Sequence, residues 1–465
     1  MRTLPKYVLS ILILNAVTAQ GAITITNIAQ GSAGLHRLFL KSDGSMWGLG
    51  RNTSGALGDS AYDNVGQPRE IITNGVTAVA VGAAHSLFIK SDGSLWGMGG
   101  NTCGCLGDGT SAYSMDPPEE IVSNGVIAIA AGPYHSLFVK SDGSLWGMGH
   151  NSWGELGDGT FTSNPPFGVI SPEEIVSNGV IAVATGYGHS LFIKSDGSLW
   201  AMGSENYGQL GDGSNGGTPY NAINQPEEIV ASNVTAIAAG SLHSLFLKSD
   251  GSLWGMGSNQ SGQLGAGTSS NIPKEIVASN VTAIATGRSH SLFIKSDGSL
   301  WAMGWNESGQ LGDGTWNLSS SEPEEIVTSG VTAIAAGDGY HGSGYSLFAK
   351  SDGSLWAMGD DSAGQLGDGF WNSSIDQSIV PEQIIPQPQP ILTQTVSGAD
   401  LQFTATCGFG GDFYLLTSTN LNQPLSEWMP ICTNTITYRY HNVFSATLTN
   451  AVNSGCPQFY ILQSK

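Results

Sequence analysis

One block of fifteen residues recurs seven times along this chain, and it limits the possible folds more than any other feature. The block reads H-S-L-F-I-K-S-D-G-S-L-W-G-M-G with few changes. Its tryptophans lie 47 to 55 residues apart, at Trp47, Trp96, Trp146, Trp200, Trp254, Trp301 and Trp356. Repeats of this length indicate an array in which each unit packs against its neighbours.

Each repeat contains four segments with the composition of short β-strands, here called A to D. In one copy, A covers Val234–Gly240, B covers His243–Lys248 and C covers Ser252–Gly257; the D strand before them covers Pro226–Val230. B and C meet at Asp250-Gly251, a strong tight-hairpin signal because such turns need positive φ.

Four short strands in each of seven repeats predict an all-β chain that forms a seven-bladed β-propeller of four-stranded blades. Closing the ring removes the exposed edges of single sheets. An open β-solenoid is the alternative, but its coils are usually shorter. We expect the propeller to cover 23–386. The sequence leaves open how the ring closes; Ile25–Gly31 could supply the first A strand and Pro381–Ile385 the last D strand.

Composition excludes several other classes of protein. Glycine supplies 65 of 465 residues, which argues against helical bundles and coiled coils. Hydrophobic residues make up 40%, too many for a disordered chain. The formal net charge is −21 and no basic cluster occurs, so we expect no nucleic-acid partner.

The extended motif G-x-x-H-S-L-x-x-x-S-D-G-S-L-W-G-x-G-x-N-x-x-G-Q-L-G-D-G resembles the regulator of chromosome condensation repeat, whose family forms seven-bladed propellers. The likeness covers roughly residues 23 to 386 and implies the fold more firmly than the function. Guanine-nucleotide exchange, as in the family namesake, is one implied activity; the charge and the absence of a basic tail count against it. The resemblance is to the secreted bacterial type of this family, in which a β-lactamase inhibitor with this kind of propeller is a precedent for a binding role, by analogy only.

The two ends depart from the repeat. Residues 1–19 read as a signal peptide, with Arg2 and Lys6 before the apolar run Val8–Ala19, which is too short to span a membrane. We therefore expect a secreted or cell-surface, extracellular or periplasmic monomer without a membrane span.

After the propeller, 387–390 read as a proline-rich linker and 391–465 as a small C-terminal β-sandwich-like module. Its strand-like runs are Leu401–Thr406, Phe413–Thr417, Tyr438–Tyr440 and Phe459–Leu462.

Five cysteines fit an oxidising compartment without showing one. Cys407 could pair with Cys432 or with Cys456, and the sequence does not choose between them. Cys103 and Cys105 stand two apart, a spacing that suits neither zinc nor an unstrained disulfide.

Most repeated polar residues have a structural interpretation. We expect hydrogen bonding for the histidines that open strand B, replaced by Tyr345 in the last repeat, because equivalent residues of neighbouring blades lie too far apart to share a metal ion. They are His36, His85, His135, His189, His243 and His290. The strand C tryptophans should pack between blades. The aspartates of the Asp-Gly and Gly-Asp-Gly motifs should shape turns rather than bind calcium. No catalytic or cofactor motif occurs, so we expect neither an enzyme nor a cofactor.

The repeats differ mainly in the A–B and C–D loops, which emerge on one face of the ring. These loops carry aromatic residues, which commonly anchor interfaces. The ligand-binding candidates are Tyr134, Tyr187, Tyr340, Trp153, Trp305, Trp316 and Trp371. We therefore predict a non-enzymatic binding or scaffold propeller that holds a protein or glycan on this face. A lyase or hydrolase at the propeller mouth is an alternative, using the long loop with Asp338, Tyr340 and His341.

Overall fold

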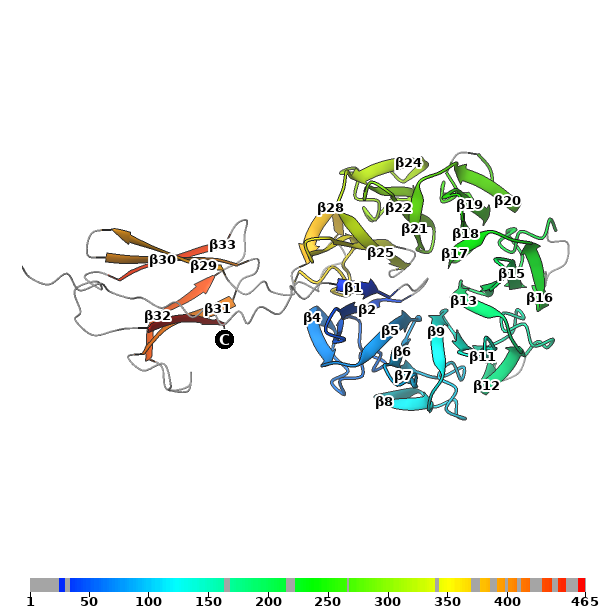
Figure 1. The fold of residues 1–465 in the computed structure, drawn as a ribbon, viewed down its shortest axis with the longest axis horizontal. Coiled ribbons are helices and arrows are strands. Elements are labelled where there is room, and N and C mark those ends of the chain that lie inside the picture. Colours follow the sequence, from blue (N-terminus) through cyan, green and yellow to red (C-terminus); the bar gives the residue numbers. More distant parts are fainter. Residues whose placement is uncertain are drawn as a thin grey trace, which may run out of the picture. The chain divides into compact units, whose positions relative to one another are not determined.

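The protein forms seven four-stranded antiparallel sheets arranged as blades around an axis (Figure 1). The computed structural model describes residues 25–29, 34–162, 168–214, 222–265, 267–338, 343–368 and 377–384, and the backbone of six strands between 391 and 464. The chain divides into two compact units. One comprises Ile23–Ile384, and the other includes Ile385–Lys465.

The strands follow one another in chain order, four to a blade. Blades 1 to 3 contain β1 (Ile25–Ile28), β2 (His36–Lys41), β3 (Met46–Gly50), β4 (Val65–Ile72), β5 (Val76–Val81), β6 (His85–Lys90), β7 (Leu95–Gly100), β8 (Ser114–Val122), β9 (Val126–Ala131), β10 (His135–Lys140), β11 (Leu145–His150) and β12 (Gly168–Val176). Blades 4 and 5 contain β13 (Val180–Thr185), β14 (His189–Lys194), β15 (Leu199–Ser204), β16 (Ala222–Val230), β17 (Val234–Ala239), β18 (His243–Lys248), β19 (Leu253–Gly257) and β20 (Ser270–Val277). Blades 6 and 7 contain β21 (Val281–Thr286), β22 (His290–Lys295), β23 (Leu300–Trp305), β24 (Ser319–Val327), β25 (Val331–Asp338), β26 (Gly344–Lys350), β27 (Leu355–Asp360) and β28 (Gln377–Ile384).

Within each blade, strand A lies nearest the axis and strand D forms the rim (Figure 1). Strand B is buried on both faces because each blade packs between two others; its central phenylalanine has no exposed surface in any blade. These residues are Phe39, Phe88, Phe138, Phe192, Phe246, Phe293 and Phe348. Each hydrophobic cluster joins side chains of two adjacent blades, so a blade has no complete core by itself.

The B–C and D–A turns meet on one face, called here the turn face. In blade 2, the amide of Ser91 donates to the carbonyl of Gly75 (2.8 Å), and Val126 of blade 3 donates to the carbonyl of Gly93 (2.9 Å). Gly93 has φ of 78°, as the Asp-Gly turn requires. The A–B and C–D loops form the opposite face, called here the loop face.

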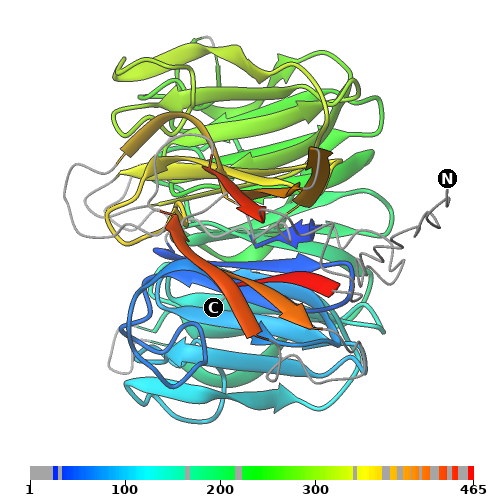
Figure 2. The same ribbon diagram turned by 90° about the vertical axis from the view of Figure 1, so that its left-hand side faces the viewer.

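The ring closes between blades 7 and 1 without exchanging a strand. Blade 1 uses β1 to β4 and blade 7 uses β25 to β28, and these blades lie side by side in Figures 1 and 2. One hydrophobic cluster joins Ile28 and Leu49 of blade 1 to Leu347 and Leu366 of blade 7. The candidate first A and last D strands correspond to β1 and β28, while residues 30, 31 and 385 of those candidates lie outside the described residues.

The outer strands are longer than the sequence predicted. The expected D strand Pro226–Val230 is the end of a nine-residue strand, β16. The preceding residues pair because β16 continues along β15 past a register shift, which brings Ile223 opposite Gly203. The prediction stopped short because these residues lack the apolar alternation of a typical strand.

The C-terminal unit contains two three-stranded antiparallel sheets, ordered β29-β30-β33 and β32-β31-β34. Their strands are β29 (Ile391–Ser397), β30 (Asp400–Cys407), β31 (Gly411–Ser418), β32 (Met429–Ile436), β33 (Asn442–Leu448) and β34 (Phe459–Ser464). Three predicted strand runs lie within β30, β31 and β34. The fourth, Tyr438–Tyr440, lies outside the described residues, and the sandwich arrangement stays a prediction.

The proposed signal peptide, 1–19, and the linker, 387–390, also lie outside the described residues. Among the residues that are described, no helix is long and apolar enough to cross a membrane.

Candidate functional site

A ring of hydrogen bonds ties neighbouring blades together just beneath the loop face. Each strand B histidine places Nε2 2.7 to 3.0 Å from a serine Oγ of the next blade, as in His243 and Ser291. The serine hydroxyl donates onward to a loop carbonyl, as Ser291 does to Gln263 (2.7 Å), so the histidine must donate from Nε2. Burial lowers the pKa of His243 to about 3 and keeps the ring neutral. The predicted hydrogen-bonding role is confirmed.

The turn face repeats one arrangement in all seven blades. The Asp250 carboxylate accepts from the amide (2.9 Å) and hydroxyl (2.6 Å) of Ser252, and these bonds lower the pKa of Asp250. Ser252 in turn accepts from the indole of Trp254 (2.8 Å), which stacks on Phe246 and lies under the ammonium of Lys248. The turn role of Asp250 and the packing role of Trp254 are confirmed.

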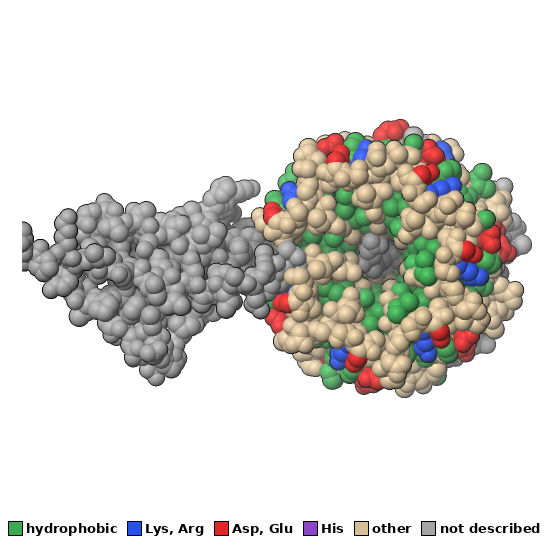
Figure 3. All heavy atoms as spheres, in the orientation of Figure 1, with side chains coloured by type: hydrophobic (Ala, Val, Ile, Leu, Met, Phe, Trp, Pro, Cys, Tyr) green, Lys and Arg blue, Asp and Glu red, His purple; other side chains and the backbone are tan. Residues whose placement is uncertain are grey.

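The face in Figure 3 carries acidic and basic side chains around its rim, while hydrophobic side chains surround the axis. The repeated Lys and Asp of the turn face balance each other's charge. The excess of acidic groups therefore comes from the rest of the molecule, including the paired glutamates on the outer strands.

Three predicted aromatic residues come together on the loop face between blades 3 and 4. Tyr134 and Tyr187 meet edge to face with ring centroids 6.3 Å apart, and Trp153 lies 5.7 Å from Tyr187. Each tyrosine is 41% exposed. Trp153 is half-buried against Gly188, where a Cβ atom would lie 2.6 Å from the indole. We call Tyr134, His150, Trp153 and Tyr187 the aromatic group.

A buried contact between a histidine and a carboxylate supports this group from below. Glu155 is fully buried; one carboxylate oxygen contacts Nδ1 of His150, and the other accepts from the amide of Trp153 (2.8 Å). The His150 ring lies 5.0 Å from Trp153 and 6.2 Å from Tyr134. Because Glu155 fixes both the imidazole and the Trp153 loop, the exposed tyrosines rest on a rigid base.

Sequence analysis missed His150 and Glu155, although each departs from its repeat position. Four of the other blades have glutamine where blade 3 has Glu155, and two have serine where it has His150. Comparing the seven copies at each position, rather than searching for known motifs, would have found them.

Comparison with known proteins agrees with this architecture. A family model for the RCC1-like domain matches residues 13–273, and models for the regulator of chromosome condensation (RCC1) repeat match 281–310 and 297–341. The chain belongs to the RCC1-like domain family.

Curated relatives match only part of this RCC1-like chain. The ultraviolet-B receptor UVR8 of Arabidopsis thaliana is 34% identical over 101 residues, which cover 21% of this chain and 22% of the receptor. The human E3 ubiquitin-protein ligase HERC2 is 31% identical over 103 residues, which cover 22% of this chain and 2% of the ligase. The chain thus matches less than a quarter of the length of either relative.

Two solved structures share the fold with TM-scores of 0.63 and 22% identity. Human WBSCR16 is covered over 95% of its length and 75% of this chain. Prp20p from Saccharomyces cerevisiae, described with its binding to Gsp1p and histones, is covered over 87% of its length and 78% of this chain. At this identity the likeness shows the fold alone.

The remaining aromatic candidates of the RCC1-like propeller lie elsewhere. Trp305 ends β23 in blade 6 and Trp316 lies in the following loop, 57% exposed. The structure does not bring these two residues into the aromatic group of blades 3 and 4. Tyr340 and Trp371 lie outside the described residues.

The loop around Asp338 does not present a free carboxylate. Asp338 is buried and forms an ion pair with Arg288 (3.4 Å). Tyr340 and His341, its partners in the predicted mouth site, lie outside the described residues.

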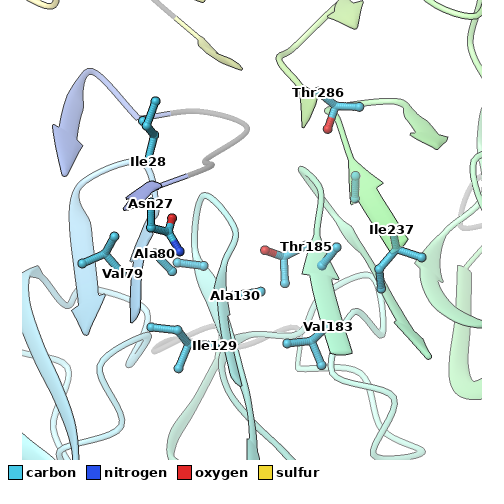
Figure 4. A pocket seen from close by; sticks show the side chains of 13 residues that line it. Asn27, Ile28, Val79, Ala80, Ile129, Ala130, Val183, Thr185, Ile237 and Thr286 are labelled. Atoms are coloured by element: carbon cyan, nitrogen blue, oxygen red, sulfur yellow. The ribbon is translucent and has the colours of Figure 1, made fainter. Parts of the chain in front are cut away.

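The axis of the RCC1-like propeller holds a cavity of about 240 Å³ lined by the inner strands (Figure 4). Its walls are mainly small and β-branched side chains such as Val79, Ala130 and Ile237, with Asn27, Thr185 and Thr286 as the polar ones. Among the described residues, its lining contains no acid–base pair.

Two cysteines adjoin the aromatic group, and both are free thiols. Burial raises the pKa of Cys103 and, more strongly, that of buried Cys105, whose Sγ donates to the carbonyl of Gly100 (3.2 Å). A nucleophilic cysteine needs the opposite shift. The C-terminal candidates Cys407 and Cys432 lie in β30 and β32 without described side chains, and Cys456 lies outside the description, so their pairing stays a prediction.

Proposed function

We propose that this chain is a non-enzymatic binding propeller that holds a protein partner on its loop face, with the aromatic group as the central contact. The RCC1-like family, to which the chain belongs, consists mostly of binding or regulatory proteins. The observation that carries the proposal is the pair of partly exposed tyrosines, Tyr134 and Tyr187, on the rigid base of Glu155. Pre-organised aromatic side chains anchor interfaces because little conformational freedom remains to be lost on binding.

Charge suggests what kind of protein surface would fit. The chain carries a net charge of −21, while the repeated turn residues balance each other. A partner with basic residues around an apolar contact would gain from electrostatic steering as well as from the tyrosines. We further propose that the protein works outside the cytoplasm after loss of residues 1–19.

The test is partner capture followed by measurement of affinity. The chain without residues 1–19 is used to isolate a partner from culture supernatant, and Kd is measured for wild type and for Tyr134→Ala/Tyr187→Ala. We expect affinity to fall about tenfold to thirtyfold, as for other buried aromatic anchors.

Tyr113→Ala is the matched control, because Tyr113 is 75% exposed in a neighbouring loop but lies outside the aromatic group. Equal affinities for wild type and the double variant would contradict the proposal. A captured glycan whose binding responds to the same substitutions would replace the protein partner with a carbohydrate.

A further inference from the structure

One side-chain hydrogen bond recurs in the C–D loops of four blades. In blade 2, Asn101 Nδ2 donates to Asp108 (2.8 Å), while Asn101 Oδ1 accepts from the amide of Leu106 (2.9 Å). The same Asn–Asp pairing occurs at Asn52, Asn151 and Asn306. The asparagine amide thus donates with one end and accepts with the other, which holds the loop closed.

Blades 4 and 7 have a carboxylic acid in place of this asparagine. Glu205 accepts from the Leu210 amide (2.6 Å), and Asp361 accepts from the Leu366 amide (2.5 Å), so the accepting half of the arrangement is kept. The aspartates that pair with asparagine in the other blades are also kept, as Asp212 and Asp368, and each lies close enough to its acid neighbour to raise the pKa of that neighbour.

The hydrogen bond that asparagine Nδ2 donates to the aspartate in the other blades is missing here unless the carboxyl group is protonated. Oε1 of Glu205 and Oδ2 of Asp361 are buried and have no hydrogen-bond donor. The two residues are only 2% and 1% exposed, so bulk solvent has little access to these oxygens. Two facing carboxylates in such a place repel each other, whereas one proton between them restores the missing hydrogen bond.

We propose that Glu205 with Asp212, and Asp361 with Asp368, each share one proton, and that these two carboxyl–carboxylate pairs are acid-stabilised latches on the loop face. Raising the pH removes the proton and loosens the loops of blades 4 and 7, while the asparagine-containing loops stay closed.

The surrounding charges act in the same direction at Glu205. Burial, Asp212 and Glu227 of β16 all raise its pKa, to about 8. At Asp361, burial and Asp368 raise the pKa, while the buried guanidinium of Arg37 on β2 opposes them. The main contributors to the pKa of Glu205 among the described residues thus include no cation, whereas those at Asp361 include Arg37.

A shared proton explains these pairs better than a bound cation. Calcium takes six to eight oxygen ligands. Among the described residues no group of three or more His, Cys, Asp or Glu side chains is placed to hold a metal ion. The pair also copies the position of an Asn–Asp hydrogen bond, which contains a proton and no ion.

The latch in blade 4 also reaches the neighbouring blade. The loop after Asp212 is held to blade 5 by Asn271, whose side chain donates to the carbonyls of Gly213 (2.9 Å) and Ser214 (2.8 Å). Loss of the proton at Glu205 therefore affects the part of the loop face between blades 4 and 5.

The test compares thermal unfolding of wild type with Glu205→Gln/Asp361→Asn from pH 5 to pH 9. Both substitutions restore an amide, so both should fold. A raised folded-state pKa stabilises the protein below the unfolded-state pKa, and this stabilisation is lost as pH rises toward the folded-state value. We expect the variant's Tm to exceed that of wild type by about 2 °C or more at pH 9, with a much smaller difference at pH 5.

Two further measurements separate a latch from a general stability effect. Asn101→Asp installs a third acid pair and should add pH dependence. Hydrogen exchange of backbone amides gives the second measurement. In wild type above pH 8, the protection of the Leu210 and Leu366 amides should fall by about tenfold relative to Leu106 and Leu156, the corresponding amides of asparagine-containing loops. Infrared spectra at pH 7 should contain a protonated-carboxyl band that the double variant lacks.

Three results would overturn the proposal. They are identical pH profiles for wild type and the double variant, absence of the protonated-carboxyl band, or stabilisation at pH 9 by calcium that a chelator reverses. The last result would assign the pairs to a cation instead of a proton.

Discussion

At the scale of single residues, burial decides the protonation state of the repeated histidines. Each donates from Nε2 to the serine of the next blade and is almost completely buried, which disfavours the imidazolium form. In His135, His189, His243 and His290 the other ring nitrogen, Nδ1, is buried without a hydrogen-bond partner. Their lowered pKa makes the blade interfaces sensitive to acid, the opposite of the latches at Glu205 and Asp361.

We predict that acid unfolds the propeller through these histidines and that His243→Gln reduces the effect. The folded-state pKa of His243 is about 3, so its contribution is complete above 6.5 and is lost as pH falls toward 3. A glutamine amide can still donate to Ser291 but does not take up a proton. We compare the free energy of unfolding of the variant with that of wild type at each pH. This difference should shift in favour of the variant by about 2 kcal/mol between pH 7.5 and pH 4.5. Chemical unfolding at both pH values measures this, and parallel losses in the two proteins would disprove it.

At the scale of elements, the B–C hairpin shows how far sequence reasoning reached. The Asp-Gly signal at Asp250-Gly251 correctly placed the turn, because its chemistry is local: one carboxylate bonds two atoms of Ser252. The length of β16 and the contact of His150 with Glu155 depend on neighbouring strands and loops. Local patterns therefore predicted the repeated elements, while contacts unique to one blade required the structure.

We predict that Asp250→Ala lowers the free energy of unfolding by a small but measurable amount, since one turn loses two hydrogen bonds at an exposed site. Partner binding should stay unchanged because the turn face lies opposite the aromatic group. Denaturant unfolding and the affinity assay together check this. Weaker binding with unchanged stability would show that the partner uses the turn face.

At the scale of the whole molecule, the closing interface differs from the other six. Where those interfaces have histidine and serine, blades 7 and 1 have Tyr345 and Arg37. The Arg37 guanidinium lies over the Tyr345 ring, and the tyrosine hydroxyl donates to the carbonyl of Gly34 (3.0 Å). The sequence showed the tyrosine, but its pairing with Arg37 depends on residues more than 300 positions apart meeting at ring closure.

We predict strong coupling between these two residues. Arg37→Ser and Tyr345→His should each destabilise the propeller by about 3 kcal/mol, because each leaves a buried partner unmatched. The double variant rebuilds the pair used at the other interfaces, so it should be more stable than the sum of the single effects predicts, by about 1–3 kcal/mol. Additive losses in a double-mutant cycle would mean that the two side chains do not act as a pair.

The Arg37–Tyr345 pair has a consequence for how such a chain can change by duplication. Blades that all carry histidine on one side and serine on the other are interchangeable, so copying or deleting an internal repeat creates no mismatched interface. Tyr345 of blade 7 matches Arg37 of blade 1 and not the serine of an internal blade. The ring therefore closes between the first and last blades, whatever the number of repeats between them. If blade 7 of one molecule packed against blade 2 of another, Tyr345 would meet a serine in place of Arg37. This mismatch favours closed rings over chains of linked molecules.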